Sequence, residues 1–105
     1  YFAVDDDAVA IKAGWDCAGY EGGTPSNNIT IRNLTVWHGG GGISIGSEMS
    51  GGVSNVLIED VLLQHGSYGL FIKTGGNAIT RGGFVENITF RRVQIVGVQK
   101  SAVTM

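Results

Sequence analysis

The sequence predicts an all-β chain that winds into a parallel β-helix of about four coils. Three observations support this prediction: many glycines between short strands, a repeated asparagine-led strand, and no helical periodicity. Glycine accounts for 18 of the 105 residues and proline for one, while 43% of the residues are hydrophobic. The glycines separate short β-branched runs, which is typical of turn-rich β structure rather than of disorder.

The repeat is the strongest signal in the sequence. Asn28, Asn55 and Asn87 each precede an apolar-x-apolar run, at spacings of 27 and 32 residues. A second series interleaves with the first at spacings of 34, 27 and 31 residues: Ile11, Ile45, Ile72 and Val103. Two series per period indicate coils that contribute to at least two parallel sheets. A β-sandwich is the alternative for regular short strands, but asparagines that recur at one position favour stacked coils with a corner ladder.

The expected elements follow from these series. The predicted strands cover residues 8–13, 28–36, 43–45, 55–63, 69–74 and 87–95. Loops are expected at 14–26 and 75–83, where glycines and the single proline gather. We expect almost no α-helix, because no segment shows a 3.6-residue period.

Composition excludes several partners. The net charge of −2 argues against nucleic acid, and no apolar run approaches the length of a membrane span. Cys17 is the single cysteine and has no internal disulfide partner. The sequence begins at Tyr1 in the middle of the repeat pattern, so we expect residues 1–105 to be the central segment of a longer β-helix domain.

A run of four glycines, Gly39 to Gly42, leads into the strand Ile43-Ser-Ile45. Without a Cβ, these residues allow a substrate or a neighbouring backbone to come close. The carboxylates of Asp6 and Asp7 open an earlier strand, and Lys73 ends a later one. We expect these three segments to stack side by side as the floor of a binding cleft.

Five sequence stretches together resemble the pectin-degrading glycoside hydrolases of family 28. They are Asp6-Asp-Ala-Val-Ala-Ile-Lys-Ala-Gly-Trp-Asp16, Pro25-Ser-Asn-Asn-Ile-Thr-Ile31, Gly42-Ile-Ser-Ile-Gly-Ser-Glu-Met-Ser-Gly-Gly-Val53, Gly69-Leu-Phe-Ile-Lys-Thr74 and Arg81-Gly-Gly-Phe-Val-Glu-Asn-Ile88. The resemblance implies a right-handed, single-stranded parallel β-helix. It also implies hydrolysis of α-1,4 bonds between galacturonic acid units with inversion, no cofactor, and an extracellular or cell-wall location. The family's third catalytic aspartate belongs to an Asn-x-Asp motif on the preceding coil, which this sequence lacks.

The resemblance assigns catalysis to the carboxylate pair. Asp6 matches the family's general acid and Asp7 one of its two candidate bases. Inverting hydrolases hold two carboxyl groups about 6.5–9.5 Å apart, which neighbouring coils about 4.8 Å apart can provide. The alternative for residues 5–7 is a solvated loop or a calcium site of the kind found in pectate lyases.

Substrate-binding residues are expected on the neighbouring coils. Lys73 matches the family's substrate-binding lysine, while Phe71 replaces its arginine and shares a face with Lys73. The register of the second series places Lys12, Gly46 and Lys73 in one column, with the two cations about 9.6 Å apart. The remaining predicted contacts with substrate are Gly40, which stands where many members carry a histidine, and Arg81, a candidate for the missing guanidinium.

Other polar and aromatic residues have two interpretations each. His38 either reaches the site or faces solvent at a strand end, and His65 is expected on the surface. Ser47 and Glu48 either stabilise a turn or contact ligand, and Trp15 and Tyr20 either line a sugar-binding rim or anchor their loop. The sequons at Asn28, Asn33 and Asn87 fit glycosylation, although a corner ladder competes for the first and third.

Three functions therefore remain open. The first is hydrolysis of polygalacturonate or a related pectin polysaccharide. The second is a catalytically impaired carbohydrate-binding or structural β-helix, and the third is a calcium-dependent lyase. Apart from the polysaccharide, the expected partner is a second copy, because unpaired end coils favour self-association.

Overall fold

A computed structural model describes residues 1–74 and 82–105. Eight strands and one helix follow one another along this part of the chain. Their bounds are β1 Phe2–Ala3, β2 Val9–Ile11, α1 Asp16–Gly22, β3 Ser26–His38, β4 Gly41–Ile45, β5 Val53–Gln64, β6 Tyr68–Ile72, β7 Val85–Val96 and β8 Ser101–Thr104.

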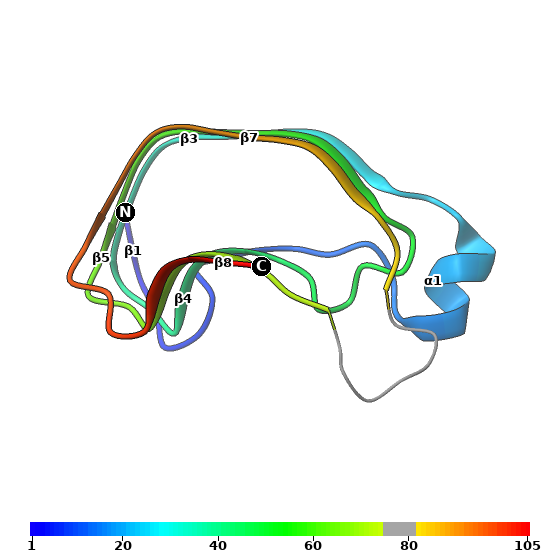
Figure 1. Cartoon of the computed structure of the whole chain (residues 1–105), viewed down its shortest axis with the longest axis horizontal. Coiled ribbons are helices and arrows are strands. Elements are labelled where there is room, and N and C mark those ends of the chain that lie inside the picture. The colour runs from blue at the N-terminus through cyan, green and yellow to red at the C-terminus, as the bar shows by residue number, and fades with distance from the viewer. Residues whose placement is uncertain (75–81) are drawn as a thin grey trace.

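The strands wind into stacked coils (Figure 1). Within residues 1–74 and 82–105 they form two four-stranded sheets, in the orders β1-β3-β5-β7 and β2-β4-β6-β8. Every neighbouring pair is parallel. A β-sandwich is thereby excluded, because its sheets are antiparallel, and the predicted parallel β-helix is confirmed with strands from four coils in each sheet.

The two predicted strand series correspond to the two sheets. Ile11 pairs with Ile45 and Ile45 with Ile72, as the repeat predicts. The fourth member of the series, Val103, is two residues out of register: it pairs with Leu70, whereas the series predicts Ile72 as its partner. A shift by two keeps a side chain on the same face of a strand, so Val103 retains the inward orientation that the pattern predicts.

The core lies between the two sheets. Its most deeply buried side chains are aliphatic: Val36, Ile43, Ile45, Val53, Val56, Ile58 and Leu63. They come from β3, β4 and β5, the strands of the middle coils. In the outermost coils equivalent positions are less covered, and Val103 in β8 is 50% exposed.

Asparagines in the left-handed conformation bend the long strands. Asn28, Asn55 and Asn87 have φ between 52° and 56° and lie in register on successive coils. Asparagine tolerates this conformation better than most residues. The predicted corner ladder forms, but Asn27 takes the place of Asn28 in it. The Asn55 amide donates to Asn27 Oδ1 at 2.8 Å, and the Asn87 amide donates to Asn55 Oδ1.

A second bend carries an ionic network that the repeat analysis did not predict. Glu59 lies in register between Arg32 and Arg91 on the neighbouring strands. Its carboxylate accepts hydrogen bonds from Arg91 and Arg92, and Arg92 also pairs with Asp60. Hydrogen bonds from Arg91 to Glu59 and from Arg92 to Asp60 hold the pKa of each carboxyl below its ordinary value. Opposite charges on adjacent strands thus stabilise the stacking.

The predicted loop 14–26 contains the short helix α1, which fits the expectation of almost no α-helix but corrects the assignment of its residues as loop. Seven residues are too few to show a helical period in the sequence. The helix ends at Gly23, which has φ 56° and donates its N–H to the Gly19 carbonyl at 3.2 Å. Glycine at such a position is the usual C-terminal signal. In the described residues no helix is long and apolar enough to cross a membrane.

Candidate active site

The glycine run lies directly beneath the acidic loop. The Gly40 N–H donates to the Asp6 carbonyl at 3.1 Å, and the Ala8 N–H donates to the Gly41 carbonyl at 3.0 Å. A Cβ at Gly40 would lie 3.0 Å from the Asp5 carbonyl oxygen, and one at Gly41 would collide with Asp7 Oδ1. The missing side chains therefore make room for this loop, and Gly40 contacts the loop backbone.

Asp6 and Asp7 occupy different environments. The Asp6 side chain is exposed, and its Oδ1 accepts the Asp7 N–H at 2.8 Å. Asp7 turns inward over Gly41, and 12% of its side chain is exposed. One carboxyl group therefore faces solvent and the other is held against the sheet.

Lys73 reaches Asp7 from two coils away. Its Nζ lies 2.8 Å from Asp7 Oδ2, although 66 residues separate the two in the sequence. The same ammonium lies 5.1 Å from the centroid of the Phe71 ring. Phe71 and Lys73 thus share the outer face of β6, as strand alternation predicts. Within the structure, the carboxylate partner of Lys73 is Asp7.

Two residues that the sequence reasoning did not select continue this surface. The Tyr68 ring stacks on Phe71 with centroids 4.6 Å apart and an interplanar angle of 26°. Lys100 Nζ lies 5.2 Å from the centroid of Tyr68. Strand alternation would place Tyr68 and Phe71 on opposite faces. Gly69 and Leu70 break this alternation because both face the interior: a Cβ at Gly69 would meet Ile95, and the Leu70 side chain is buried. Tyr68 and Phe71, which flank them, therefore lie on the same outer face.

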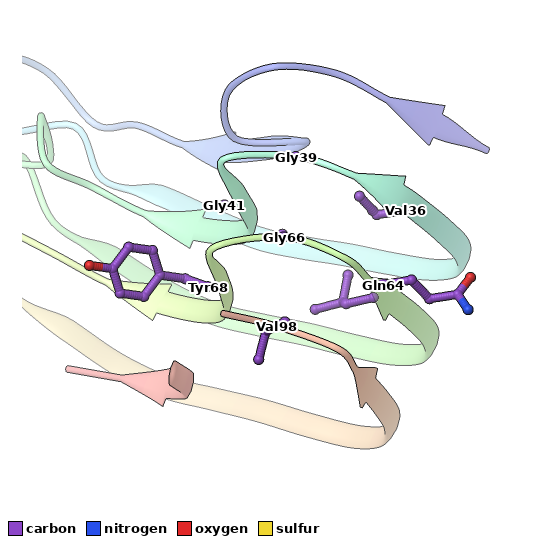
Figure 2. Close-up of a pocket in the computed structure, with 9 residues that line it drawn as sticks. Val36, Gly39, Gly41, Gln64, Gly66, Tyr68 and Val98 are labelled. Carbon is purple, nitrogen blue, oxygen red and sulfur yellow. The ribbon is translucent and has the colours of Figure 1, made fainter. Parts of the chain in front are cut away.

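Figure 2 shows the bend at the start of this face. Gly39, Gly66 and Val98 lie at the same place in successive coils, and Tyr68 follows the second of them. The Ser67 N–H donates to the Gly39 carbonyl at 3.3 Å, and the Gln99 N–H donates to the Gly66 carbonyl at 2.9 Å. The loops that precede β4, β6 and β8 are therefore joined to one another by backbone hydrogen bonds.

A buried hydroxyl lies at the centre of the face. Ser44 is 0% exposed and pairs with Phe71 in the register of β4 and β6. Among the described residues its Oγ has no hydrogen-bond partner. A Cβ at Gly41 would contact both Ser44 Oγ and the Asp7 carboxylate, so the hydroxyl lies close to that acid.

Lys12 lies in the predicted column with Gly46 and Lys73, and its ammonium pairs with a different carboxylate from that of Lys73. Its ammonium donates to the Gly46 carbonyl at 2.9 Å and pairs with Glu48. Ser47 Oγ donates to the same carboxylate at 2.6 Å. Hydrogen bonds from Lys12 and then Ser47 lower the pKa of Glu48 to about 2. These contacts support the turn-stabilising interpretation of Ser47 and Glu48, and they give Lys12 a carboxylate partner of its own.

The remaining candidates lie elsewhere. His38 ends β3, is exposed, and bonds the Val4 carbonyl through Nδ1 at 3.1 Å. His65 is exposed, as expected, with its ring 5.0 Å from that of Trp37. Trp15 and Tyr20 are exposed at α1, at the far end of the coil from the acidic loop (Figure 1). Arg81 lies outside the described residues. Among the described residues, no group of three or more metal-binding side chains occurs.

The fold places the chain among the parallel β-helix proteins, and an adjacent pair of carboxylates, a lysine and two stacked aromatic rings lie together on it. The family model for glycosyl hydrolases family 28 matches residues 1–105. The chain therefore belongs to this family.

Similar proteins carry polygalacturonase names. The chain is 42% identical over 92 residues to a probable polygalacturonase of Vitis vinifera. The match covers 87% of this chain and 18% of that protein. It is 36% identical to a polygalacturonase of Ralstonia nicotianae, over 98% of this chain and 18% of that protein. An endo-polygalacturonase of Pectobacterium carotovorum is also 36% identical, over 93% of this chain and 22% of its own length. The chain thus spans about a fifth of the length of these relatives.

A solved structure has the same fold. The hyperthermoactive exopolygalacturonase of Thermotoga maritima superposes with a TM-score of 0.76 and 32% identity. The match covers 98% of this chain and 27% of that one. The two sheets described above are therefore part of the β-helix architecture that this enzyme shares.

Proposed function

We propose that this protein hydrolyses α-1,4 bonds between galacturonic acid units of polygalacturonate, by inversion at the anomeric carbon. The observation that supports this most is the placement of Asp6 and Asp7 on the outer face of a β-helix whose whole sequence matches the family. The names of the similar proteins support the same substrate.

In this mechanism Asp6 is the general acid. Its exposed carboxyl group protonates the leaving glycosidic oxygen, while the hydrogen bond from the Asp7 N–H fixes its orientation. Asp7 is the base that takes a proton from the attacking water, since the glycine run and the ion pair with Lys73 hold its carboxylate in place. The third carboxylate that the family resemblance implies, in an Asn-x-Asp motif, is not among residues 1–105.

Besides holding Asp7, Lys73 binds the carboxylate of the substrate in this proposal. A uronate that enters beside Asp7 brings a carboxylate, which competes for the ammonium of Lys73. Phe71 forms the adjacent surface on which the sugar lies, next to the buried Ser44 on the neighbouring strand. A polymeric pectin substrate would favour an extracellular or cell-wall location, which is part of this proposal.

The test is the release of reducing ends from polygalacturonate by the full-length protein. Asp6→Asn is expected to lower the rate by about a thousandfold, because amide replaces the proton donor. Asp5→Asn is the matched control, since Asp5 is the exposed acid beside it, and it should change the rate less than about threefold. Equal activity of Asp6→Asn and the parent protein would contradict the proposal.

A second function has one observation in its favour. Phe71 replaces the arginine of the family, and Lys73 is already paired with Asp7, so the surface resembles a binding platform as well as a catalytic one. A folded parent protein that binds polygalacturonate without releasing reducing ends would establish this carbohydrate-binding alternative. Unsaturated products that absorb ultraviolet light would instead establish lyase chemistry.

A further inference from the structure

Four side chains form a continuous strip along the outer face of β6: Tyr68 and Phe71 lie in this strand, while Lys73 directly follows β6 and Lys100 directly precedes β8. Lys73 lies over Phe71 at 5.1 Å, Phe71 stacks on Tyr68 at 4.6 Å, and Lys100 lies over Tyr68 at 5.2 Å. Two aromatic rings therefore stand between two ammonium groups. The strip extends from Asp7 at one end to the coil that follows Lys73 at the other.

The two lysines of this strip differ in their partners. The ammonium of Lys73 is neutralised by Asp7 at 2.8 Å. Across residues 1–74 and 82–105, the Lys100 ammonium has the Tyr68 ring as its only interaction partner, with no ion pair. The backbone of Lys100 is nevertheless fixed, because its N–H donates to the Ser67 carbonyl at 2.9 Å. An exposed cation held on an aromatic ring is well placed to receive an anion from outside.

We propose that Lys100, positioned by Tyr68, binds the carboxylate of a galacturonate unit one coil beyond the Asp6–Asp7 pair. This inference rests on the proposed function and adds a subsite that distinguishes free uronates from their methyl esters. Lys100 is a specificity residue in this scheme, and Tyr68 is its positioning residue.

The chemistry follows from the charges on the strip. Polygalacturonate carries one carboxylate on every sugar, so a chain that contacts the Asp7 region presents further carboxylates to the neighbouring coil. A charge-assisted hydrogen bond from an ammonium to a carboxylate is roughly twice as strong as a neutral one. Because the Tyr68 ring restricts the flexible lysine stem, less conformational entropy is lost when the anion binds.

A structural role alone does not explain this arrangement. The aromatic pair already packs through Phe71 against the face that covers Ser44. Lys100 adds a positive charge at the other end of the strip, and within residues 1–74 and 82–105 no internal anion pairs with it. An external carboxylate supplies the missing counter-charge.

The experiment measures binding of tetragalacturonate and of its fully methyl-esterified form at low ionic strength. Calorimetry is done on the full-length protein in the Asp6→Asn background, which prevents turnover. Lys100→Met keeps the length of the stem and is expected to weaken tetragalacturonate binding about tenfold. It should leave binding of the methyl ester within about twofold, because the ester offers no charge to Lys100.

Three further variants make the test specific. Lys100→Arg should retain most of the affinity, and Tyr68→Leu should weaken tetragalacturonate binding about threefold by releasing the lysine. Arg32→Gln removes one charge from the exposed surface of the opposite sheet and should change affinity less than about twofold. A loss for Arg32→Gln equal to that for Lys100→Met would reveal a general charge effect and overturn the subsite.

Other outcomes also decide the question. Equal loss for the acid and the ester would show that Lys100 acts through structure, and unchanged binding of the acid would show that it has no role. Hydrolysis of polygalacturonate by the parent protein, combined with normal binding by Lys100→Met, defeats this inference alone. Absence of hydrolysis, combined with charge-dependent loss in Lys100→Met, defeats the proposed function and leaves the subsite standing.

Discussion

At the scale of single residues, the floor of the site depends on atoms that are missing. Gly39, Gly40 and Gly41 allow the backbone of residues 5–7 to lie on the sheet, and Gly41 gives space to the Asp7 carboxylate. Glycine is costly in a strand because it loses more conformational freedom than other residues. Its use at three consecutive positions is explained by the close approach of the acidic loop.

We predict that Gly41→Ala lowers the rate of polygalacturonate hydrolysis at least tenfold. The new methyl group displaces Asp7 Oδ1 and weakens the ion pair with Lys73, and a small misplacement of a catalytic group is costly. The free energy of unfolding should fall by less than about 2 kcal/mol, because only one side chain has to move. Rate assays and urea denaturation of the full-length protein measure both effects.

The matched control is Gly22→Ala. A Cβ at Gly22 meets nothing within 4 Å, and this residue ends α1 at the far end of the coil. Its activity should equal that of the parent protein, with stability unchanged or raised by about 0.5 kcal/mol. Full activity of Gly41→Ala would show that the position of Asp7 is not critical.

The Glu48 carboxyl group gives a prediction about pH. Lys12 and Ser47 lower its pKa from 4.5 to about 2 in the folded chain. The folded-state pKa lies below the unfolded value, so the stabilisation is fully present above about pH 4.5 and is lost as pH falls towards 2. Since Lys12 is 43% exposed, we expect only about 1 kcal/mol.

Urea denaturation from pH 7 to pH 2 should therefore show the parent protein more stable than Glu48→Gln at neutral pH. The difference should shrink as the pH falls from 4.5 to 2, because Glu48 takes up its proton in the unfolded chain before it does so in the folded chain. A difference that stays constant down to pH 2 would rule out the ion pair as its source.

At the scale of elements, the long strands are bent by residues in the left-handed conformation. Asn55 combines this backbone conformation, with φ 54°, with two side-chain hydrogen bonds to the coils on either side. The register of β3, β5 and β7 makes the bend recur at the same place in each coil. One residue type therefore determines both the direction of the chain and the alignment of neighbouring strands.

We predict that Asn55→Ala lowers the free energy of unfolding by about 2 kcal/mol. Alanine loses the two hydrogen bonds and is strained at positive φ, with each effect contributing about 1 kcal/mol. Asn55→Gly should cost about 1 kcal/mol less, because glycine adopts this conformation without strain. Equal stabilities of the two variants in urea would show that backbone strain plays no part.

The outer face of β6 shows why strand alternation alone does not predict which side chains meet. The simple two-residue period correctly places Phe71 with Lys73, but it separates Tyr68 from Phe71. Gly69 interrupts the period, and the two rings stack. An isolated glycine within a strand pattern is a recognised sign of such an irregularity, although it does not say which neighbours are brought together.

At the scale of the whole molecule, stacking supplies the core and leaves the outer coils less covered. The middle strand β5 contains side chains at 0–2% exposure, whereas Val103 and Met105 near the end of the described chain are 50% and 90% exposed. Coils of a solenoid are stabilised mainly by their neighbours. Four coils taken alone are therefore limited in stability, because the first and the last coil are each covered by a neighbour on one side only.

We predict that the 105-residue chain, expressed alone, self-associates and has low stability. Its apolar end residues and unpaired strand edges favour contact with a second copy. Sedimentation velocity across a concentration series should show an average mass that rises with concentration. A sharp monomeric unfolding transition that is independent of concentration would contradict this prediction.

The repeat of Asn28, Asn55 and Asn87 and the isoleucine series determined the fold from sequence alone, because stacked coils require the same side-chain pattern at each level. The short motifs likewise indicated the family and the acidic pair. Tertiary structure decided which groups meet: Asp7 with Lys73, Lys12 with Glu48, and Lys100 with Tyr68. A column predicts which residues are neighbours, but the direction of a long side chain depends on the charges and rings that other coils place around it.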